Sequence, residues 1–256
     1  MDLLTIVKAG GKIVENADSL QSFLKDFARI SGHKLLIHGG GRSATQLAER
    51  LGIPSQMVDG RRITDEETLK VVTMVYAGLV NKNIVAQLQA LNIDAIGLTG
   101  VDMNLISAVK RPVQTIDYGF VGDVQHVNSL ALKYLLDQNY LPVLAPITHN
   151  GKGVLLNTNA DTIASETAKA LAYDFNVRLI YCFEKKGVLS NENDENSTIS
   201  TLNKEEFLQY KAAGIIHAGM IPKLENAFEA IASGVKEVII TRASDIHTGG
   251  GTFIKN

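Results

Sequence analysis

The chain has 256 residues, of which 45% are hydrophobic and 20% charged, and its formal net charge at pH 7 is −2. Such a composition is ordinary for a globular enzyme, and a near-neutral chain without Lys/Arg runs gives no electrostatic basis for binding nucleic acid. No stretch approaches about 18 uninterrupted apolar residues, so we expect no membrane span. The single cysteine, Cys182, cannot form an internal disulfide, which favours a reducing cytoplasm.

The N-terminal half alternates short apolar runs with segments of helical periodicity. A predicted strand at 3–7 leads into Lys8-Ala9-Gly10-Gly11, and a second at 35–37 leads into His38-Gly39-Gly40-Gly41. Further predicted elements are helices at about 18–30 and 42–51, a hairpin at 57–64, a long helix from 65 to about 91, a strand at 95–98, and hairpin strands around 105–109, 113–116 and 120–127.

The C-terminal half continues the same alternation. It predicts helices at about 129–138, 161–173, 203–211 and 222–233, strands at 141–145, 177–183, 238–241 and 252–254, and a polar hairpin tip at 190–197. Alternating strands and helices indicate an α/β fold with a mostly parallel sheet and helices on both faces. We expect one domain, with an N-lobe of about 1–173 and a C-lobe of about 174–256.

The two glycine turns suggest a site for phosphate. Each follows a predicted strand, and the second precedes a helix, so backbone N–H groups and a helix N-terminus come together there. Lys8 adds a fixed cation at the end of the first strand. Either turn alone is compatible with a simple tight connection between strand and helix, whereas the pair with Lys8 favours anion binding.

Two nucleotide-binding alternatives fit less of the chain. No Gly-x-x-x-x-Gly-Lys-Ser/Thr motif occurs, which argues against a standard P-loop. Gly39 to Ala44 matches the dinucleotide pattern G-x-G-x-x-A, with Asp59 near the position of a ribose-binding acid. If this match made the chain a dehydrogenase, Lys8 and Lys223 would have no role.

Phosphoryl transfer uses more of these residues. Its transition state spreads negative charge over oxygens, so the protein contributes positioning and cations. Lys8 and Lys223, which precedes a late helix, are candidates for these cations. Asp161, at the start of another helix, is a candidate for orienting both ammonium groups, although an acid there also complements a helix dipole.

Six motifs in order carry a resemblance to a known family. They are Lys8-Ala9-Gly10-Gly11, His38-Gly39-Gly40-Gly41, Asp59-Gly60-Arg61-Arg62-Ile63-Thr64, Tyr118-Gly119-Phe120-Val121-Gly122-Asp123-Val124, Asn157-Thr158-Asn159-Ala160-Asp161 and Gly219-Met220-Ile221-Pro222-Lys223. Over essentially the whole chain they resemble the amino acid kinase family, and within it the kinases that act on N-acetylglutamate.

The resemblance implies a three-layer α/β/α sandwich, with an acyl-amino-acid lobe and an ATP lobe. It implies transfer of the ATP γ-phosphate to the side-chain carboxylate of an N-acyl-L-glutamate, acetyl or succinyl, in arginine biosynthesis. Mg²⁺ would bind mainly through ATP oxygens, so no protein metal ligand is named. The residues implied are catalytic Lys8, Lys223 and Asp161; substrate-binding Gly40, Gly41, Arg62 and Asn159; and nucleotide-binding Gly10, Gly11, Glu184, Gly187, Ile216 and His217.

The chain departs from the family pattern after the strand at 177–183. Glu184-Lys185-Lys186-Gly187 stands where similar kinases have Asp-x-x-Gly. Either Glu184 contacts the lysine that this aspartate contacts in those kinases, or another residue has taken over the role of the aspartate. Other readings are a carbamate or aspartate kinase and a non-catalytic sensor on this fold. The early first strand leaves no room for the N-terminal helix of arginine-regulated hexamers, so we expect a homodimer without arginine inhibition.

Overall fold

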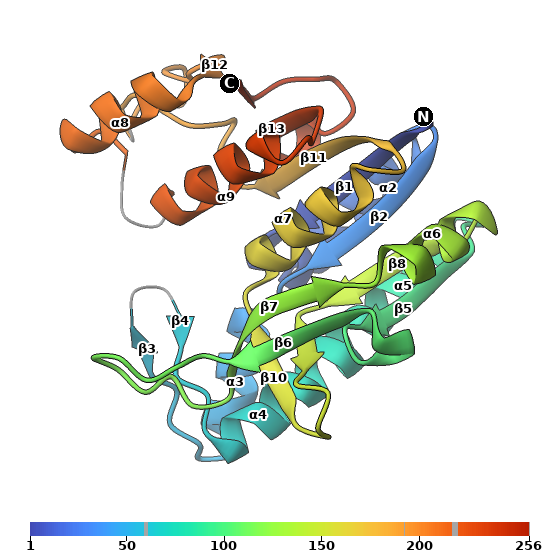
Figure 1. The fold of residues 1–256 in the computed structure, drawn as a ribbon. Coiled ribbons are helices and arrows are strands. Elements are labelled where there is room, and N and C mark those ends of the chain that lie inside the picture. The colour runs from blue at the N-terminus through green and yellow to red at the C-terminus, as the bar shows by residue number, and fades with distance from the viewer. Residues whose placement is uncertain (59–60, 192, 217–219, 256) are drawn as a thin grey trace.

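A computed structural model describes residues 1–58, 61–191, 193–216 and 220–255. Its centre is an eight-stranded sheet in the order β12-β14-β13-β11-β1-β2-β8-β5 (Figure 1). Every pairing in this sheet is parallel except that of β13 with β14. The strands are β1 (Leu3–Ala9), β2 (His33–His38), β5 (Ala95–Thr99), β8 (Leu141–Ala145), β11 (Asn176–Phe183), β12 (Thr201–Leu202), β13 (Glu237–Arg242) and β14 (Thr252–Ile254). The predicted mostly parallel α/β sheet is confirmed.

Helices cover both faces of the sheet, and each face has its own hydrophobic core. Figure 1 shows α7 and α9 side by side over one face. The helices of that face are α6 (Ser129–Asp137), α7 (Ala160–Leu171), α8 (Lys204–Ala212) and α9 (Ile221–Ala232). The opposite face carries α1 (Gly11–Glu15), α2 (Ala17–Ala28), α3 (Gly41–Arg50), α4 (Glu66–Thr73), the π-helical segment η1 (Met74–Val80) and α5 (Asn81–Gln89). Because strand side chains alternate, one residue in two along each central strand joins each core.

A smaller group of strands lies beside the main sheet. Strands β6 (Ile106–Lys110), β7 (Val121–Val127), β9 (Ile147–His149) and β10 (Leu155–Thr158) close into a small barrel, and β3 (Met57–Val58) pairs antiparallel with β4 (Arg61–Arg62). The hairpin predicted at 57–64 is confirmed, although its Asp59-Gly60 turn lies outside the described residues. The strand predicted at 113–116 is wrong. Pro112 lacks a backbone donor and Val113 is 61% exposed, so the run has no buried face to hold a strand.

The long helix predicted from 65 begins one residue later and is not α-helical throughout. Asp65 caps it by accepting a hydrogen bond from Thr68 N–H at 2.8 Å. The middle segment, η1, is π-helical, a feature often found near functional sites. Within the described ranges, Glu66–Gln89 alone is long and apolar enough to cross a membrane by length and composition, and Ile84 and Leu88 are buried in the core of the fold.

Candidate active site

Three charged side chains meet at the carboxyl end of β1. Leu4, Ile6 and Lys8 share one face of this strand because strand side chains alternate, and Leu4 and Ile6 lie in the core beneath α6–α9. Lys8 therefore points toward α7 and α9. The first turns of these two helices carry Asp161 and Lys223.

Asp161 bridges the two lysines. Lys8 Nζ lies 2.8 Å from Asp161 Oδ1, and Lys223 Nζ donates to Asp161 Oδ2. The Lys8 contact is an ion pair by distance, and Oδ1 accepts no hydrogen bond of good geometry from the described part of the chain. The side chains of Lys8, Asp161 and Lys223 are only 11%, 13% and 22% exposed. The interaction is therefore shielded from the screening that weakens surface ion pairs.

Protonation in this cluster follows from burial and charge. Burial alone raises the pKa of the Asp161 carboxyl, but the Lys8 and Lys223 ammonium groups outweigh burial and hold that pKa well below its ordinary value. Burial lowers the pKa of Lys8, while the Asp161 charge opposes this change. Asp161 is consequently a carboxylate at neutral pH and a very weak base.

The glycine turn after β1 is tied to its neighbours on both sides. Gly10 N–H donates to Cys182 O at 2.9 Å, and Gly39 N–H donates to Ala9 O at 3.3 Å. A Cβ on Gly10 would lie 3.2 Å from Cys182 O, so a larger residue here would have to displace the neighbouring strand by a few tenths of an ångström. Gly11 begins α1 and lies beside Gly39. The structure therefore brings the two predicted glycine turns together next to Lys8.

The second glycine turn presents unpaired backbone donors. α3 begins at Gly41, and a Cβ on Gly40 would lie 3.0 Å from the Tyr76 ring, so only glycine fits there without a shift. The N–H groups of Gly40, Gly41 and Arg42 donate to no acceptor within the part of the chain that the structure describes. They are the first donors of a helix, which is where an anion binds most readily.

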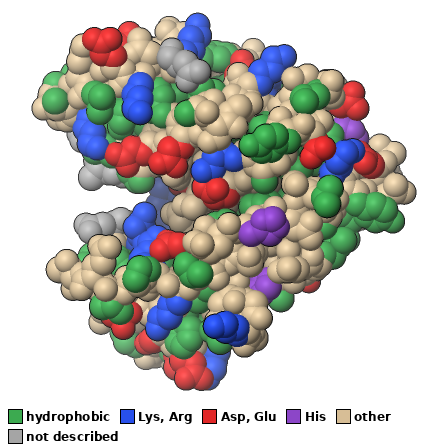
Figure 2. Space-filling model, in the orientation of Figure 1, with side chains coloured by type: hydrophobic (Ala, Val, Ile, Leu, Met, Phe, Trp, Pro, Cys, Tyr) green, Lys and Arg blue, Asp and Glu red, His purple; other side chains and the backbone are tan. Residues whose placement is uncertain are grey.

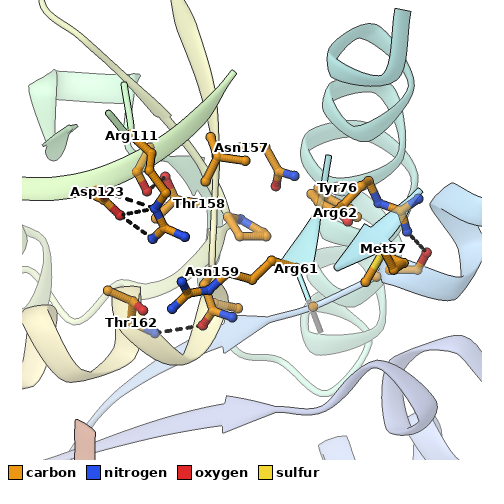
Figure 3. Close-up of a pocket in the computed structure, with 17 residues that line it drawn as sticks. Met57, Arg61, Arg62, Tyr76, Arg111, Asp123, Asn157, Thr158, Asn159 and Thr162 are labelled. Carbon is orange, nitrogen blue, oxygen red and sulfur yellow. Dashed lines mark hydrogen bonds and ion pairs between the residues drawn. The ribbon is translucent and has the colours of Figure 1, made fainter. Parts of the chain in front are cut away.

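Arg62 lines a cavity of about 180 Å³ beside these donors (Figure 3). Its side chain is held from two directions: Nη2 donates to Gly41 O and Thr45 Oγ1, both at 2.8 Å, and Nη1 donates to Ser55 Oγ at 2.9 Å. A guanidinium has five N–H donors. Three of the donors of Arg62 are used within the protein, which leaves two for a ligand in the cavity.

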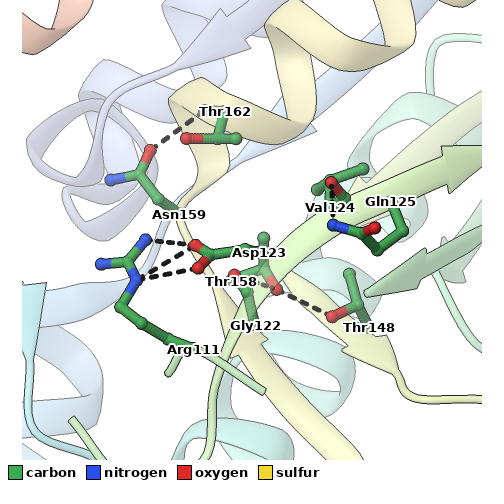
Figure 4. Close-up of polar contacts among 9 residues, drawn as sticks. All are labelled: Arg111, Gly122, Asp123, Val124, Gln125, Thr148, Thr158, Asn159 and Thr162. Atoms are coloured by element: carbon green, nitrogen blue, oxygen red, sulfur yellow. Dashed lines mark hydrogen bonds and ion pairs between the residues drawn. The ribbon is translucent and has the colours of Figure 1, made fainter. Parts of the chain in front are cut away.

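Asn159 joins this cavity to the charged cluster. Its Oδ1 caps α7 by accepting from Asp161 N–H at 2.8 Å and from Thr162 N–H at 3.0 Å. Figures 3 and 4 show the contact with Thr162. The amide nitrogen of Asn159 donates to no other described residue and remains available to a ligand in the cavity that Asn159 lines. The cap also fixes Asp161 in the first turn of α7.

The predicted nucleotide residues are more scattered. Glu184 lies 43% exposed in an ion pair with Lys12 of α1, while Lys223 is held by Asp161, so Glu184 does not join the lysine cluster. A Cβ on Gly187 would lie 2.5 Å from Thr252 Oγ1, so close packing against Thr252 explains a glycine at this position without any ligand. Ile216 is 4% exposed, in the core between sheet and helices. His217 lies outside the described residues.

Sequence reasoning missed several residues around the cavity. Arg111 forms a bidentate pair with Asp123, with Nε 3.0 and 3.2 Å from the two carboxylate oxygens (Figure 4). Arg61 and Tyr76 also line the cavity. Glu15 accepts from the N–H of Ser43 in α3 at 2.9 Å. Asp123 and Arg61 lie inside motifs that are visible in the sequence, whereas no sequence motif indicates a role for Arg111 or Glu15.

The arrangement suits transfer of an anionic group between small molecules. Figure 2 shows the molecule hollowed between the part that carries α8 and α9 and the part that carries β3 and β4. Two fixed cations, free helix N-terminal donors and an arginine with spare donors are what a phosphoryl-transfer site requires. Fold and site together define the class as an α/β phosphotransferase for small molecules.

Comparison with known proteins agrees with this class. The model of the amino acid kinase family matches residues 4–242, and the chain belongs to that family. A protein of Phocaeicola vulgatus named acetylglutamate kinase is 65% identical over 98% of each chain, and one of the same name from Bacteroides fragilis is 64% identical over 98% of this chain and 97% of its own. The solved structure of smu.665 from Streptococcus mutans superposes with a TM-score of 0.80 at 27% identity, covering 98% of both chains.

Proposed function

We propose that the chain transfers the γ-phosphate of ATP to the side-chain carboxylate of N-acetyl-L-glutamate, giving an acyl phosphate and ADP. The observation that carries this proposal is the buried Lys8–Asp161–Lys223 cluster beside the free N–H groups of the second glycine turn. The names of relatives 64–65% identical over nearly the whole chain support the same activity and imply a place in arginine biosynthesis.

The proposed reaction assigns a role to each part of the site. A carboxylate oxygen of the acceptor attacks the γ-phosphorus, and the bond from that phosphorus to the β-phosphate oxygen breaks. Lys8 and Lys223 stabilise the negative charge that spreads over the transferring group. The acceptor is already ionised at neutral pH, so no general base is needed. This suits Asp161, whose low pKa makes it a poor base and whose two ion pairs make it an orienting residue.

Backbone and side-chain donors would hold the two substrates. Gly40 and Gly41 N–H groups would bind the acceptor carboxylate and the transferring phosphate, and Gly10 and Gly11 would lie near the nucleotide phosphates. Asn159 Nδ2 would bind the acceptor backbone. Glu184, Gly187 and Ile216 are proposed to border the nucleotide, and so is His217, which lies outside the described residues.

Mg²⁺ fits this site as part of the nucleotide. Three carboxylates around the cleft are already engaged: Asp161 by two lysines, Asp123 by Arg111 and Glu184 by Lys12. Mg²⁺ commonly keeps several waters and binds through substrate phosphates. We therefore place it on the phosphate oxygens of ATP, where it would neutralise charge on the leaving group.

The activity is tested by trapping the product. The purified chain is incubated with MgATP and N-acetyl-L-glutamate in the presence of hydroxylamine, which converts an acyl phosphate to a coloured hydroxamate. We expect hydroxamate formation that requires both substrates. Absence of product with N-acetyl-L-glutamate, together with turnover of carbamate or aspartate, would assign the chain to a different branch of the family.

The same assay resolves the acyl group. The cavity that Arg62 lines adjoins a second one of about 420 Å³, with Arg61, Arg111 and Asp123 on the walls of both. Acetyl is the acyl group proposed here, and a longer acyl group such as succinyl would extend toward the second cavity. Comparing kcat/KM for the N-acetyl and N-succinyl acceptors decides which one the site prefers.

Arg62→Ala is expected to raise KM for the acyl-glutamate about 10- to 100-fold and to change KM for ATP little. The reason is the loss of a charge-assisted contact worth about 1.5–3 kcal/mol. Since Arg62 also holds Gly41 O and Ser55 within the protein, thermal melts must accompany the kinetics. Ser55→Ala, which removes one support and leaves the guanidinium, is the matched control and should have a smaller effect. An unchanged KM for the acceptor in Arg62→Ala removes Arg62 from the site.

We also propose a homodimer that forms through the exposed face of the helix Glu66–Gln89. Met74 and Leu79 are 53% and 67% exposed. They lie five residues apart in the π-helical segment, where this spacing places side chains on one face. Large apolar side chains gathered on one exposed face mark an interaction surface.

Leu79→Glu is expected to convert the dimer to a monomer, because it places a charge in an apolar contact. Light scattering measures the mass of the wild type and the variant. Leu130→Glu, on the exposed face of α6 and 76% exposed, is the control and should remain dimeric. A wild-type mass of one subunit or of six subunits contradicts the proposal.

A further inference from the structure

We propose that His38 is a positioning residue that fixes the Gly39–Gly40 peptide so that the Gly40 N–H faces the cavity. This inference rests on the proposed function for its catalytic consequence, although its structural part can be tested without turnover. His38 lies at the end of β2, immediately before the second glycine turn. It does not line the cavity, whereas Gly39, Gly40 and Gly41 do.

His38 is buried on the side of the sheet opposite Lys8. Along β2, Leu35 and Ile37 belong to the core beneath α6–α9, while Leu36 belongs to the core beneath α1–α5. Alternation therefore turns His38 toward the second core, where it is 0% exposed. There its Nδ1 lies 2.7 Å from Gly39 O, and its Nε2 lies 3.1 Å from Asn81 Nδ2.

The partners of Asn81 fix the orientation of its amide group. Asn81 Nδ2 donates to Val143 O at 2.9 Å, and a carbonyl oxygen can only accept. Lys82 Nζ, which can only donate, lies 3.2 Å from Asn81 Oδ1 and also donates to Gly97 O at 2.9 Å. Nδ2 must therefore be the atom facing His38, and its second hydrogen points at Nε2. A Cβ on Gly97 would lie 2.0 Å from Asn81 Oδ1, so the strand beside this amide requires glycine.

This amide orientation determines the histidine tautomer. Nε2 receives a hydrogen from Asn81 and is the acceptor, so the ring proton lies on Nδ1 and is donated to Gly39 O. Burial, with a smaller contribution from the Lys82 charge, lowers the pKa of His38 to about 4 against the opposing Gly39 hydrogen bond. Within the described residues, Lys82 is the charged group that affects His38. The ring is consequently neutral at pH 7, as the tautomer requires.

The hydrogen bond to Gly39 O determines the direction of the next N–H. A peptide unit is planar, and in the trans form its C=O and N–H point in opposite directions. The Gly39–Gly40 peptide is trans, and its carbonyl faces His38. The Gly40 N–H therefore faces away from His38, toward the cavity that Gly40 lines, and it meets no acceptor among the described residues. A glycine-rich turn is otherwise free to rotate this peptide, so a buried donor is needed to hold it.

The tautomer is tested directly on the wild-type protein. Nitrogen-15 NMR of histidine-labelled protein at pH 7, with His38 assigned by its loss in His38→Asn, distinguishes Nδ1–H from Nε2–H. We expect the Nδ1–H tautomer. In Asn81→Asp the carboxylate can only accept, so we expect His38 to gain a proton on Nε2 and its pKa to rise. An Nε2–H tautomer in the wild type overturns the proposal whatever the protein catalyses.

The catalytic consequence is tested by two amides of different length. The Asn amide nitrogen in His38→Asn reaches the position of Nδ1 and can still donate to Gly39 O, whereas the Gln in His38→Gln reaches toward Nε2 and cannot. We expect His38→Asn to keep kcat close to that of the wild type and His38→Gln to lower kcat about 10- to 100-fold, with KM for ATP little changed. Leu88→Ala, a buried truncation further along α5, controls for destabilisation and should leave kcat intact.

These results separate the two levels of the argument. A wild-type protein that makes no hydroxamate contradicts the proposed function, and the NMR result then stands by itself. An active wild type in which His38→Asn and His38→Gln have equal kcat contradicts the positioning role. A kcat restored in His38→Asn and lost in His38→Gln supports it, because loss of packing alone does not depend on which ring position the amide replaces.

Discussion

Replacing Lys8 or Lys223 with alanine is expected to lower kcat by about 30- to 1,000-fold while KM for ATP and for the acyl-glutamate changes little. Each ammonium acts on charge that develops during transfer, so its loss removes transition-state rather than ground-state stabilisation. Donors in comparable sites contribute about 2–4 kcal/mol each, which sets the expected range. Both side chains are largely buried and share one carboxylate, so water does not replace the lost cation well.

Arginine at either position should also be poor. A planar guanidinium does not occupy the place of a compact ammonium, and Asp161 holds each Nζ at a single point. Lys169→Ala provides the matched control, because Lys169 lies on α7, is 21% exposed and is paired with Glu166, yet has no place in the proposed site. Steady-state kinetics, with folding confirmed by thermal melts, measures the effect. A near-normal kcat in Lys8→Ala would rule out the proposed roles of the two lysines.

Asp161→Asn is expected to lower the free energy of unfolding by about 3–5 kcal/mol, because it leaves two buried ammonium groups without a counter-charge. For a chain of this size that corresponds to a fall in Tm on the order of 10 °C. Adding Lys223→Met to Asp161→Asn should recover part of the loss, since one unpaired charge is then removed. A double-mutant cycle measures this coupling, and strictly additive losses would contradict it.

The contribution of Asp161 also has a defined pH dependence. The pKa of Asp161 in the folded protein is lower than its ordinary value of 3.8, so the unfolded chain binds the proton more tightly. The stabilisation is fully present above about pH 3.8 and is lost as the pH falls through the folded-state pKa. The difference in stability between wild type and Asp161→Asn should therefore be constant near neutral pH and shrink below pH 4. A difference that grows toward low pH would reverse this assignment.

Asp161→Asn also separates two ways in which the acid serves catalysis. If the carboxylate only orients the lysines, kcat should fall less than in Lys8→Ala. If both ammonium groups swing away without their shared partner, the fall should be comparable to that of the lysine variants. The bridging geometry, with one oxygen to each lysine, favours the comparable effect.

Much of the fold was predictable because the main sheet is built from short apolar runs. Strand β1 is buried on both faces, and its runs of Leu, Ile and Val indicate this without any tertiary information. The π-helical segment was not predictable, since its apolar periodicity resembles that of an ordinary amphipathic helix. Residues 113–116 were predicted as a strand from alternation alone, but the Val113 side chain is exposed and does not pack into a core.

The sequence by itself determined the parts of the site that are set by local structure. Lys8 at a strand end, the two glycine turns and the acid at the start of α7 follow from positions along single elements, and their order along the chain indicated the family. The sequence suggested Asp161 as the partner of both lysines, whereas the contacts between charges far apart in the chain depend on the tertiary structure. Lys223 and Asp161 are 62 residues apart in sequence, and Lys12 and Glu184 are 172 apart. Glu184 pairs with Lys12 because the sheet order places α1 beside β11. The sequence pattern alone does not show that these two elements are neighbours. The same holds for His38, whose role depends on an asparagine brought to it by packing across the second core.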